Sequence, residues 1–283
     1  MTFRPSIELI QRAFEKGYAV PAFCVWDNAT IETVLAMAAK CRAPVLLMGG
    51  PGEFPLTGAG QFAAIARILA GQYEVRAALH LDHGDSLEMV RECLDADFTS
   101  LMLDYSARPF SENAAALRRV VEWARPRGAT VEGELGAIGR VDDATTEGGR
   151  GAGLTDPREA GVYVKETGVN MLAVAIGNAH GIYRERPRFD FERLEKLRDA
   201  AGVPLVLHGG SGTSPEDLSR AISLGIAKVN VASELIHAVR ATLEGQWERG
   251  EGRWLPLALK GAMEALGVVV KKWIQMTGAA GRA

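Results

Sequence analysis

The stretch RAALHLDHGDS, residues 76–86, places an apolar run directly before two histidines and two aspartates. The run Ala77-Ala78-Leu79 is typical of a strand that is buried on both faces of a parallel sheet. The polar side chains follow where this strand is about to end. Because functional groups in parallel α/β proteins gather at the carboxyl ends of strands, the stretch predicts a buried strand and a functional edge together.

The same pattern recurs along the chain, with amphipathic helical segments between the apolar runs. Eight strands that alternate with helices predict an α/β fold, a single-domain (β/α)8 TIM barrel over residues 1–283, although a doubly wound open sheet has the same alternation. We expect one helix before the first strand, at about 6–16, and a long C-terminal helix within 254–278. The predicted strands are AVPAFCV (19–25), PVLLMG (44–49), RAALHLD (76–82), SLMLD (100–104), TVEGELG (130–136), MLAVAIG (171–177), PLVLHG (204–209) and KVNVAS (228–233).

Composition excludes several classes of function. The chain has 283 residues and a formal charge of −3, which gives no reason to expect nucleic acid or an anionic membrane as partner. Cys24, Cys41 and Cys93 show no CxxC spacing, so neither a disulfide framework nor a zinc ribbon is indicated. We see no signal peptide and no apolar run long enough to span a bilayer. We therefore expect a cytoplasmic protein.

Three of the five histidines fall at the ends of predicted strands, namely His83, His180 and His208. Three convergent imidazoles are a common zinc set that leaves one position open for substrate or water. The alternative is that each histidine caps a strand or satisfies a local backbone group. We favour the metal site, and we expect His80 to be a packing or supporting residue and His237 to be structural or exposed.

The stretch HGGSGTSPEDL, residues 208–218, indicates an anion site. Gly209, Gly210 and Gly212 would let backbone amides surround a phosphate, and Ser233 begins a helix after the last strand. The alternative is a tight strand-to-helix connection without a ligand. A second glycine-rich segment, residues 136–156, lies in the longest gap between strands and reads either as a lid or as a solvated loop.

At this point the sequence resembles the class II, zinc-dependent ketose-bisphosphate aldolases, the fructose- and tagatose-bisphosphate aldolase family. The likeness runs in one order from near residue 17 to about 236. The stretches that carry it are GYAVPAF (17–23), ALHLDHG (78–84), VEGELG (131–136), LAVAIGNAHGIY (172–183), FDFERLEKL (189–197), VPLVLHGGSG (203–212) and GIAKVNVASEL (225–235).

This resemblance implies zinc on His83, His180 and His208, and Asp82 as the group that exchanges a proton with a substrate hydroxyl. It implies that Asp104 and Glu134 surround an alternate or second metal position. It also implies a monovalent cation (Na+ or K+) near the phosphate, a phosphorylated sugar as substrate, and a homodimer or homotetramer. The residues that it implies for the dihydroxyacetone phosphate half are Gly181, Gly209, Gly210, Ser211, Asn230, Val231, Ala232 and Ser233.

The chemistry agrees with a metal mechanism. Cleavage beside a ketone leaves an enediolate whose charge zinc can neutralise, and a carboxylate can move the hydroxyl proton. The competing Schiff-base strategy needs a lysine at a strand end, and Lys228 begins its strand instead. We therefore predict an aldolase that cleaves a ketose 1-phosphate or 1,6-bisphosphate. The alternatives are a phosphosugar-binding paralogue with altered catalysis, and a metal-dependent hydrolase or isomerase.

The chain departs from the family pattern at four places. Cys24 replaces the usual asparagine after the first strand, Tyr105 replaces a glycine after Asp104, and Asn178 stands where threonine is common. Tyr105 and Trp26 would add bulk beside the distal end of a substrate. In the 136–156 segment the usual glutamate, which moves a proton at the nucleophilic carbon, is replaced. Its candidate replacements are Asp142 first, then Asp143 and Glu147.

Overall fold

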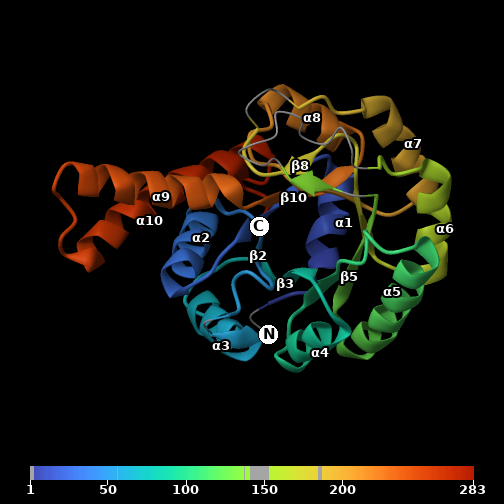
Figure 1. Ribbon diagram of the computed structural model, residues 1–283, viewed down its shortest axis with the longest axis horizontal. Coiled ribbons are helices and arrows are strands. Elements are labelled where there is room, and N and C mark those ends of the chain that lie inside the picture. Colours follow the sequence, from blue (N-terminus) through green and yellow to red (C-terminus); the bar gives the residue numbers. More distant parts are fainter. Residues whose placement is uncertain (1–2, 56, 137, 141–152, 184–186) are drawn as a thin grey trace.

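The computed structural model describes residues 3–55, 57–136, 138–140, 153–183 and 187–283. Eight parallel strands close into a barrel in the order β1-β10-β9-β7-β5-β4-β3-β2, and helices surround it (Figure 1). Closure decides between the two architectures that the alternation allowed, and it confirms the TIM barrel. The assignment of residues 1–283 to one aldolase-like domain stays a prediction.

Each predicted apolar run overlaps a barrel strand, and the boundaries agree within a few residues. β10 begins two residues earlier than predicted, so Lys228 lies inside this strand and does not begin it. The runs are apolar because helices cover the outside of the barrel while side chains fill its interior. The barrel strands are β1 (Val20–Cys24), β2 (Val45–Gly49), β3 (Ala77–Gly84), β4 (Ser100–Leu103), β5 (Thr130–Leu135), β7 (Met171–Val174), β9 (Leu205–Leu207) and β10 (Ile226–Val231).

Helices follow the strands in the expected alternation. Asp156 and Ser214 cap two of these helices, since each accepts a hydrogen bond from an amide of the first turn and is followed by proline at the first helical position. The helices are α2 (Asn28–Cys41), α3 (Gly58–Ala70), α4 (Leu87–Asp95), α5 (Phe110–Ala124), the short 3-10 turn η1 (Arg125–Arg127), α6 (Pro157–Thr167), α7 (Phe191–Ala201) and α8 (Pro215–Ser223).

The first helix, α1 (Ser6–Lys16), precedes β1, as expected, and contacts the amino end of the barrel. The Ser6 hydroxyl donates to Ser100 Oγ at 2.8 Å, and the Ile7 amide donates to Thr130 Oγ1 at 3.0 Å. Ser100 and Thr130 begin β4 and β5, so α1 packs at the end of the barrel opposite the polar rim.

Two short strands were not expected from the sequence. β6 (Gly139–Arg140) pairs with β8 (Ala179–His180) in a separate two-stranded sheet near the barrel mouth, where β8 is drawn as a short arrow in Figure 1. This pairing ties the segment after β5 to the segment that carries His180. A two-residue strand has no periodicity of its own, which is why the sequence pattern could not indicate it.

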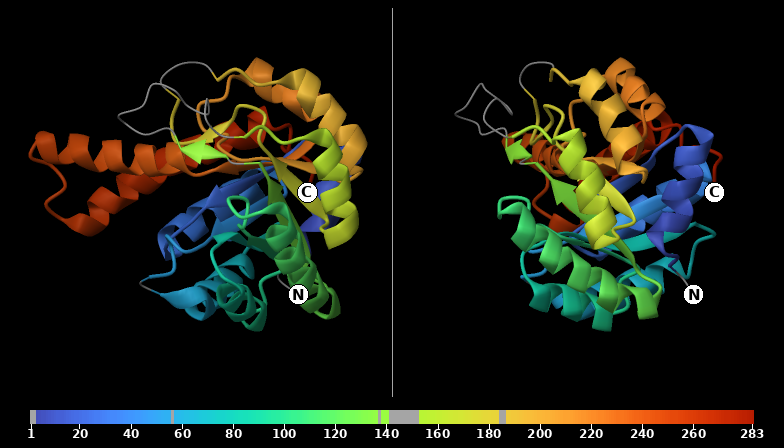
Figure 2. Two further views of the ribbon diagram at one scale, coloured as in Figure 1. Left: turned by 45° about the vertical axis from the view of Figure 1, so that its right-hand side comes forward. Right: turned by 90° about the vertical axis from the view of Figure 1, so that its right-hand side faces the viewer.

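The last two helices form a hairpin that projects beyond the barrel (Figure 2). α9 (Ser233–Glu248) begins directly after β10, and α10 (Leu255–Met276) returns along α9 and packs on α2. The predicted long C-terminal helix is therefore present. No helix within the described residues has the length and apolar composition needed to cross a bilayer, and the cytoplasmic location stays a prediction.

Candidate active site and metal centre

The site lies at the carboxyl ends of the strands, and β3 ends there in an irregular way. The pairing register between β3 and β4 shifts between Leu81 and Gly84, and His83 has a left-handed backbone with φ 45°. In a regular strand, neighbouring side chains point to opposite faces. The irregularity instead lets Asp82 and His83 both contact groups at the barrel mouth. A left-handed backbone is uncommon for histidine and is typical of a constrained functional position.

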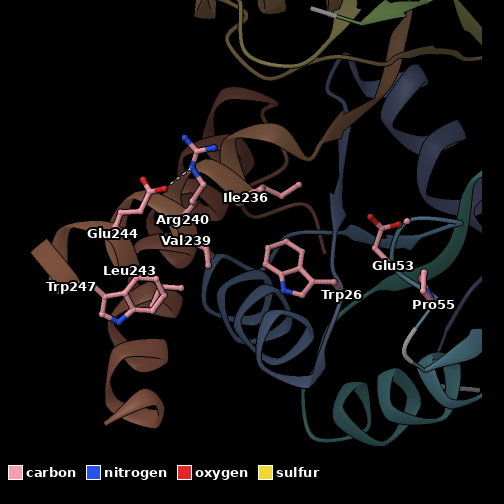
Figure 3. Close-up of a pocket in the computed structure, with 10 residues that line it drawn as sticks. Trp26, Glu53, Pro55, Ile236, Val239, Arg240, Leu243, Glu244 and Trp247 are labelled. Atoms are coloured by element: carbon pink, nitrogen blue, oxygen red, sulfur yellow. Dashed lines mark ion pairs between the residues drawn. The ribbon is translucent and has the colours of Figure 1, made fainter. Parts of the chain in front are cut away.

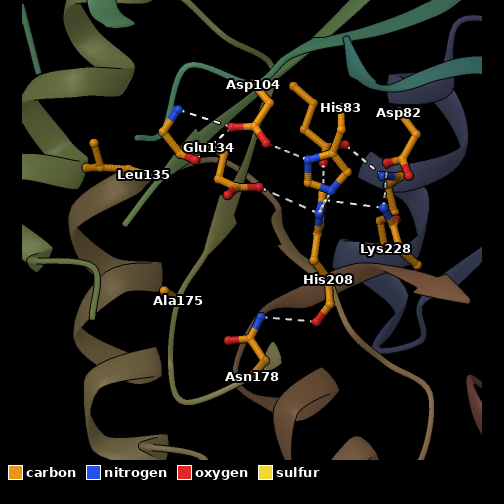
Figure 4. Close-up of polar contacts among 12 residues, drawn as sticks. Asp82, His83, Asp104, Glu134, Leu135, Ala175, Asn178, His208 and Lys228 are labelled. Carbon is orange, nitrogen blue, oxygen red and sulfur yellow. Dashed lines mark hydrogen bonds and ion pairs between the residues drawn. The ribbon is translucent and has the colours of Figure 1, made fainter. Parts of the chain in front are cut away.

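The rings of His83 and His208 meet almost at right angles at the barrel mouth, with their centres 4.7 Å apart, and Asp104 lies beside the ring of His83 (Figure 4). His83 Nδ1 lies 2.7 Å from Asp104 Oδ2, and His208 Nε2 lies 2.7 Å from Glu132 Oε1. Because carboxylates only accept hydrogen bonds, these two nitrogens carry the hydrogens. The remaining nitrogens, His83 Nε2 and His208 Nδ1, lie 2.9 Å apart. Two imidazole lone pairs therefore meet, and this contact requires a proton or a metal ion between them.

His180 completes the set from β8. Its ring centre lies 4.9 Å from that of His83 and 5.7 Å from that of His208. One nitrogen from each of the three rings falls within 4.8 Å of the others. Ligand nitrogens around a tetrahedral zinc ion are about 3.4 Å apart, which follows from a Zn–N distance of about 2.0–2.1 Å. The three histidines thus fit a divalent ion with small adjustments, and carboxylates behind two of them are typical of metal-binding histidines.

The pKa values of His83 and His208 are shifted in opposite directions. Burial lowers the pKa of His83, but the charge of Asp82 and the hydrogen bond to Asp104 outweigh burial and raise it to about 9. Burial, together with the charges of His83 and Lys228, moves the pKa of His208 well below its ordinary value. His208 is therefore neutral, as a metal ligand must be, and an ion that binds here displaces one proton from His83.

Two further acids, Asp104 and Glu134, approach His83 and form a second group with ligand atoms in mutual reach. Although burial raises the pKa of Asp104, hydrogen bonds with His83 and Ser106 outweigh burial and lower it. Burial raises the pKa of Glu134 to about 8, and its Oε2 lies 3.6 Å from His208 Nδ1. While His83 Nδ1 is bonded to Asp104, that nitrogen is not available to an ion. Their role at an alternate or second metal position stays a prediction.

Asp82 sits beside the histidines on the β10 side. Its Oδ1 accepts from Asn230 Nδ2 at 2.9 Å. The other polar atom of that amide, Asn230 Oδ1, is buried and has no hydrogen-bond partner among the described residues. Buried acceptors without a partner are rare in folded proteins.

Cys24, which the sequence marks as a departure, ends β1 in the same region. Its Sγ donates to Glu53 Oε1 at 3.3 Å, and Glu53 Oε2 accepts from the Gly50 amide at 2.8 Å. Burial and the charges of Glu53 and Asp82 raise the pKa of Cys24 well above its ordinary value, so the group is a neutral thiol. The side chain that replaces asparagine is thus held by Glu53, a residue that the sequence did not single out.

The predicted anion-binding residues come together in two adjoining loops. The Gly210 amide donates to the Asn230 carbonyl at 3.2 Å, and the Glu234 amide donates to Ser211 Oγ at 3.2 Å. A Cβ at Gly209 would lie 2.0 Å from the Ala179 carbonyl oxygen, so packing alone demands glycine there. Gly181 directly follows β8, and the binding roles of all the predicted residues stay predictions. The predicted residues that lie in these two loops near the start of α9 are Gly209, Gly210, Ser211, Asn230, Val231, Ala232 and Ser233.

The remaining positions from the sequence analysis are placed as follows. Asp142, Asp143 and Glu147 lie outside the described residues, so the lid and its proposed base stay predictions. Asn178 replaces a common threonine, and its Nδ2 donates to the His208 carbonyl at 3.0 Å. His237 is exposed on α9, as expected. Glu132, which accepts a hydrogen bond from His208, had no role assigned from the sequence. Strand alternation alone does not indicate which histidine a buried acid contacts.

Comparisons with known proteins agree with this geometry. The model of the family "Fructose-bisphosphate aldolase class-II" matches residues 5–282. The chain is 32% identical to the YdjI aldolase from Escherichia coli K12, with 99% of each chain covered and a TM-score of 0.88. It is 29% identical to a candidate fructose-1,6-bisphosphate aldolase from Coccidioides immitis, covering 100% of this chain and 99% of that one, with a TM-score of 0.86.

A third structure, the fructose-bisphosphate aldolase of Campylobacter jejuni, is 20% identical over 98% of this chain and 95% of that one. Its TM-score of 0.81 shows that the fold is shared. A family match over nearly the whole length carries more weight than any single structure. Since the match runs from residue 5 to residue 282, the chain belongs to the class-II fructose-bisphosphate aldolase family and is an aldolase, a lyase that breaks a carbon–carbon bond.

Proposed function

We propose that the protein is a zinc-dependent aldolase that reversibly cleaves a ketose 1-phosphate or 1,6-bisphosphate to dihydroxyacetone phosphate and an aldehyde. The observation that carries the proposal is the 2.9 Å contact between His83 Nε2 and His208 Nδ1, beside His180 and Asp82. When bound to these histidines, zinc would supply a Lewis acid for the negative charge that develops as the carbon–carbon bond breaks.

Asp82 is the proton-transfer group in this proposal. The hydrogen bond from Asn230 holds one of its carboxylate oxygens, and the other oxygen can take a proton from the substrate hydroxyl during cleavage. In the direction of condensation, Asp82 returns this proton. The orphan acceptor Asn230 Oδ1 can bind a second hydroxyl, which would orient the substrate against Asp82.

The substrate phosphate belongs in the two loops beside α9. α9 begins at Ser233, directly after Ala232, and the positive end of its helix dipole favours an anion there. A monovalent cation near this phosphate, Na+ or K+, is part of the proposal and rests on the family alone.

The distal half of the substrate would meet the departures from the family pattern. Arg108 stacks over the Tyr105 ring at 4.0 Å, which fixes a bulky side chain next to Asp104. Cys24 and Glu53 occupy the side nearest Asp82. We therefore expect the preferred aldehyde to differ from that of an aldolase that carries asparagine at position 24.

Metal removal tests the proposed function directly. Release of dihydroxyacetone phosphate from fructose and tagatose 1,6-bisphosphates and from several ketose 1-phosphates is expected to fall to background after chelation. Zinc is expected to restore it, because Lewis-acid stabilisation is worth several kcal/mol and about 1.4 kcal/mol corresponds to a factor of ten. A coupled assay of dihydroxyacetone phosphate measures the release. Release that is unaffected by complete metal removal would contradict the zinc mechanism.

We also propose that the protein is a homo-oligomer, a homodimer or homotetramer, held together by the projecting α9–α10 hairpin. The hairpin exposes large apolar side chains, among them Trp247 at 53%, Trp254 at 69% and Leu257 at 67%. A cavity of about 630 Å³ lies along α9, with Trp26 and Glu53 on its barrel side (Figure 3). Exposed apolar patches of this kind mark protein–protein contacts, and a second copy of the hairpin is the proposed occupant.

Charges placed on the hairpin are expected to separate the subunits. Light scattering of the wild type should give at least twice the chain mass of 30.3 kDa, and Trp254→Glu with Leu257→Glu should shift it toward one chain mass. Ile68→Glu is the matched control, since Ile68 is 68% exposed but lies on α3. A wild type that runs as a single chain would overturn the proposal.

A further inference from the structure

A chain of buried polar side chains runs through the barrel interior below the metal centre. Lys228 lies in the middle of β10 and is fully buried, as are Glu132, His80 and His208. Lys228 Nζ donates to Glu132 Oε2 at 2.8 Å, and Glu132 Oε1 accepts from His208 Nε2 at 2.7 Å. One carboxylate thus bridges an ammonium group and a candidate metal ligand.

The chain continues away from the site toward α1. Lys228 Nζ lies 3.4 Å from His80 Nε2, and His80 Nδ1 lies 2.7 Å from Ser100 Oγ. The Ser6 hydroxyl of α1 donates to the same Ser100 oxygen at 2.8 Å. Burial and the charge of Lys228 move the pKa of His80 well below its ordinary value, so His80 is a neutral acceptor for the ammonium. Lys228 Nζ therefore contacts His80 as well as Glu132.

A buried ion pair contributes little stability compared with apolar side chains of similar volume, because both charges lose their hydration. Stability alone does not account for a lysine in the centre of the barrel. The position of the ion pair accounts for it. With its Oε2 held by Lys228, Glu132 directs Oε1 at His208 Nε2, and His208 Nδ1 is left to contact His83. Figure 4 shows His208 between His83 and Lys228.

We propose that Lys228 is a positioning residue of the metal centre, which acts through Glu132 to orient His208 without touching the metal or the substrate. The inference rests on the proposed function, since it assumes that the three histidines bind a divalent ion. The inference assigns a role to Lys228, which the sequence analysis excluded as a Schiff-base lysine because it does not lie at the carboxyl end of its strand.

The test compares metal binding by Lys228→Met, Glu132→Gln and the double variant. Each single variant is expected to weaken zinc binding about 10- to 100-fold, the usual effect of losing a group that supports a metal ligand. It is also expected to shift the visible absorption of the cobalt-loaded protein, because His208 changes its orientation. If Lys228 acts through Glu132, the double variant should bind zinc within about threefold of Glu132→Gln alone. Chelator competition measures the affinities.

The matched control is Thr167→Val, which removes a buried hydroxyl that donates to the Tyr163 carbonyl at the end of α6. It should lower thermal stability without moving zinc affinity or the cobalt spectrum. Wild-type zinc affinity and cobalt spectrum in Lys228→Met would overturn the inference, as would losses that multiply in the double variant. Lys228→Met could fail to fold, whereas the double variant leaves neither charge unpaired. In that case, a double variant with the zinc affinity and cobalt spectrum of the wild type would overturn the inference.

A failure of this inference differs from a failure of the proposed function. If the wild type itself binds no zinc or cobalt at the histidines, the zinc mechanism fails together with the inference. If the wild type binds zinc and Lys228→Met binds it equally well, the inference alone is lost.

Discussion

Replacing His83 with asparagine is expected to abolish tight zinc binding and to lower kcat/KM by about three orders of magnitude or more. His83 Nε2 is one of the two nitrogens that meet at 2.9 Å, and its loss leaves two imidazoles for the ion. Loss of a Lewis acid removes several kcal/mol of transition-state stabilisation, at about 1.4 kcal/mol for each factor of ten. Metal analysis of the purified variant and the coupled assay measure both effects.

Asparagine is chosen because the backbone at position 83 has φ 45°. Asparagine tolerates the left-handed region, whereas alanine there costs about 1–2 kcal/mol of stability. His83→Ala should therefore lose zinc and stability together, while His83→Asn should lose chiefly zinc. His237→Ala, a change at an exposed histidine of α9, is the control and should retain both metal and activity. One zinc per chain in His83→Asn would contradict the assigned ligand set.

Asp82→Ala should show the opposite division of effects, keeping zinc but losing turnover. Asp82 contacts Asn230 and does not belong to the group of three histidines that would bind the ion, so the ion keeps its ligands in this variant. A positioned acid or base contributes about 10²–10⁴-fold to rate, and we expect kcat to fall by this factor. Single-turnover assays with zinc-loaded protein measure the loss.

The variant Asp82→Asn refines this test, because an asparagine oxygen can still accept the hydrogen bond from Asn230. Its loss of activity should equal that of Asp82→Ala if proton transfer, and not the contact with Asn230, is what matters. Asp85→Asn changes an exposed carboxylate in the same segment and should keep nearly full activity. Wild-type turnover in Asp82→Asn would reject Asp82 as the proton-transfer group.

The contrast between His83 and Lys228 shows how far residue patterns reach. Strand ends in a parallel barrel converge on one rim, so three histidines at three strand ends could be placed together without coordinates. Lys228 lies inside a strand, where alternation says only that it points inward or outward. Its partner Glu132 lies 96 residues away in the chain, and no local pattern connects the two.

Residue 24 shows the same limit at the substrate side. The family pattern marks Cys24 as unusual, but its hydrogen bond to Glu53 depends on how the segment after β2 folds back over β1. The same segment passes close to the end of β3, which requires a glycine at position 50, since a Cβ there would lie 2.1 Å from the Asp82 carbonyl oxygen. The sequence thus identifies Cys24 as unusual, whereas only the packing shows that Glu53 is its hydrogen-bond partner.

By itself the sequence determined the eight apolar strands, their alternation with helices and the rim on which the polar residues gather, because burial and periodicity are local properties of the chain. Only the tertiary structure decided that the sheet closes, that β3 is irregular at Asp82 and His83, and that Glu132 joins Lys228 to His208. The reason is physical: hydrogen bonds between buried groups of distant strands depend on register and on side-chain packing, which no local pattern specifies.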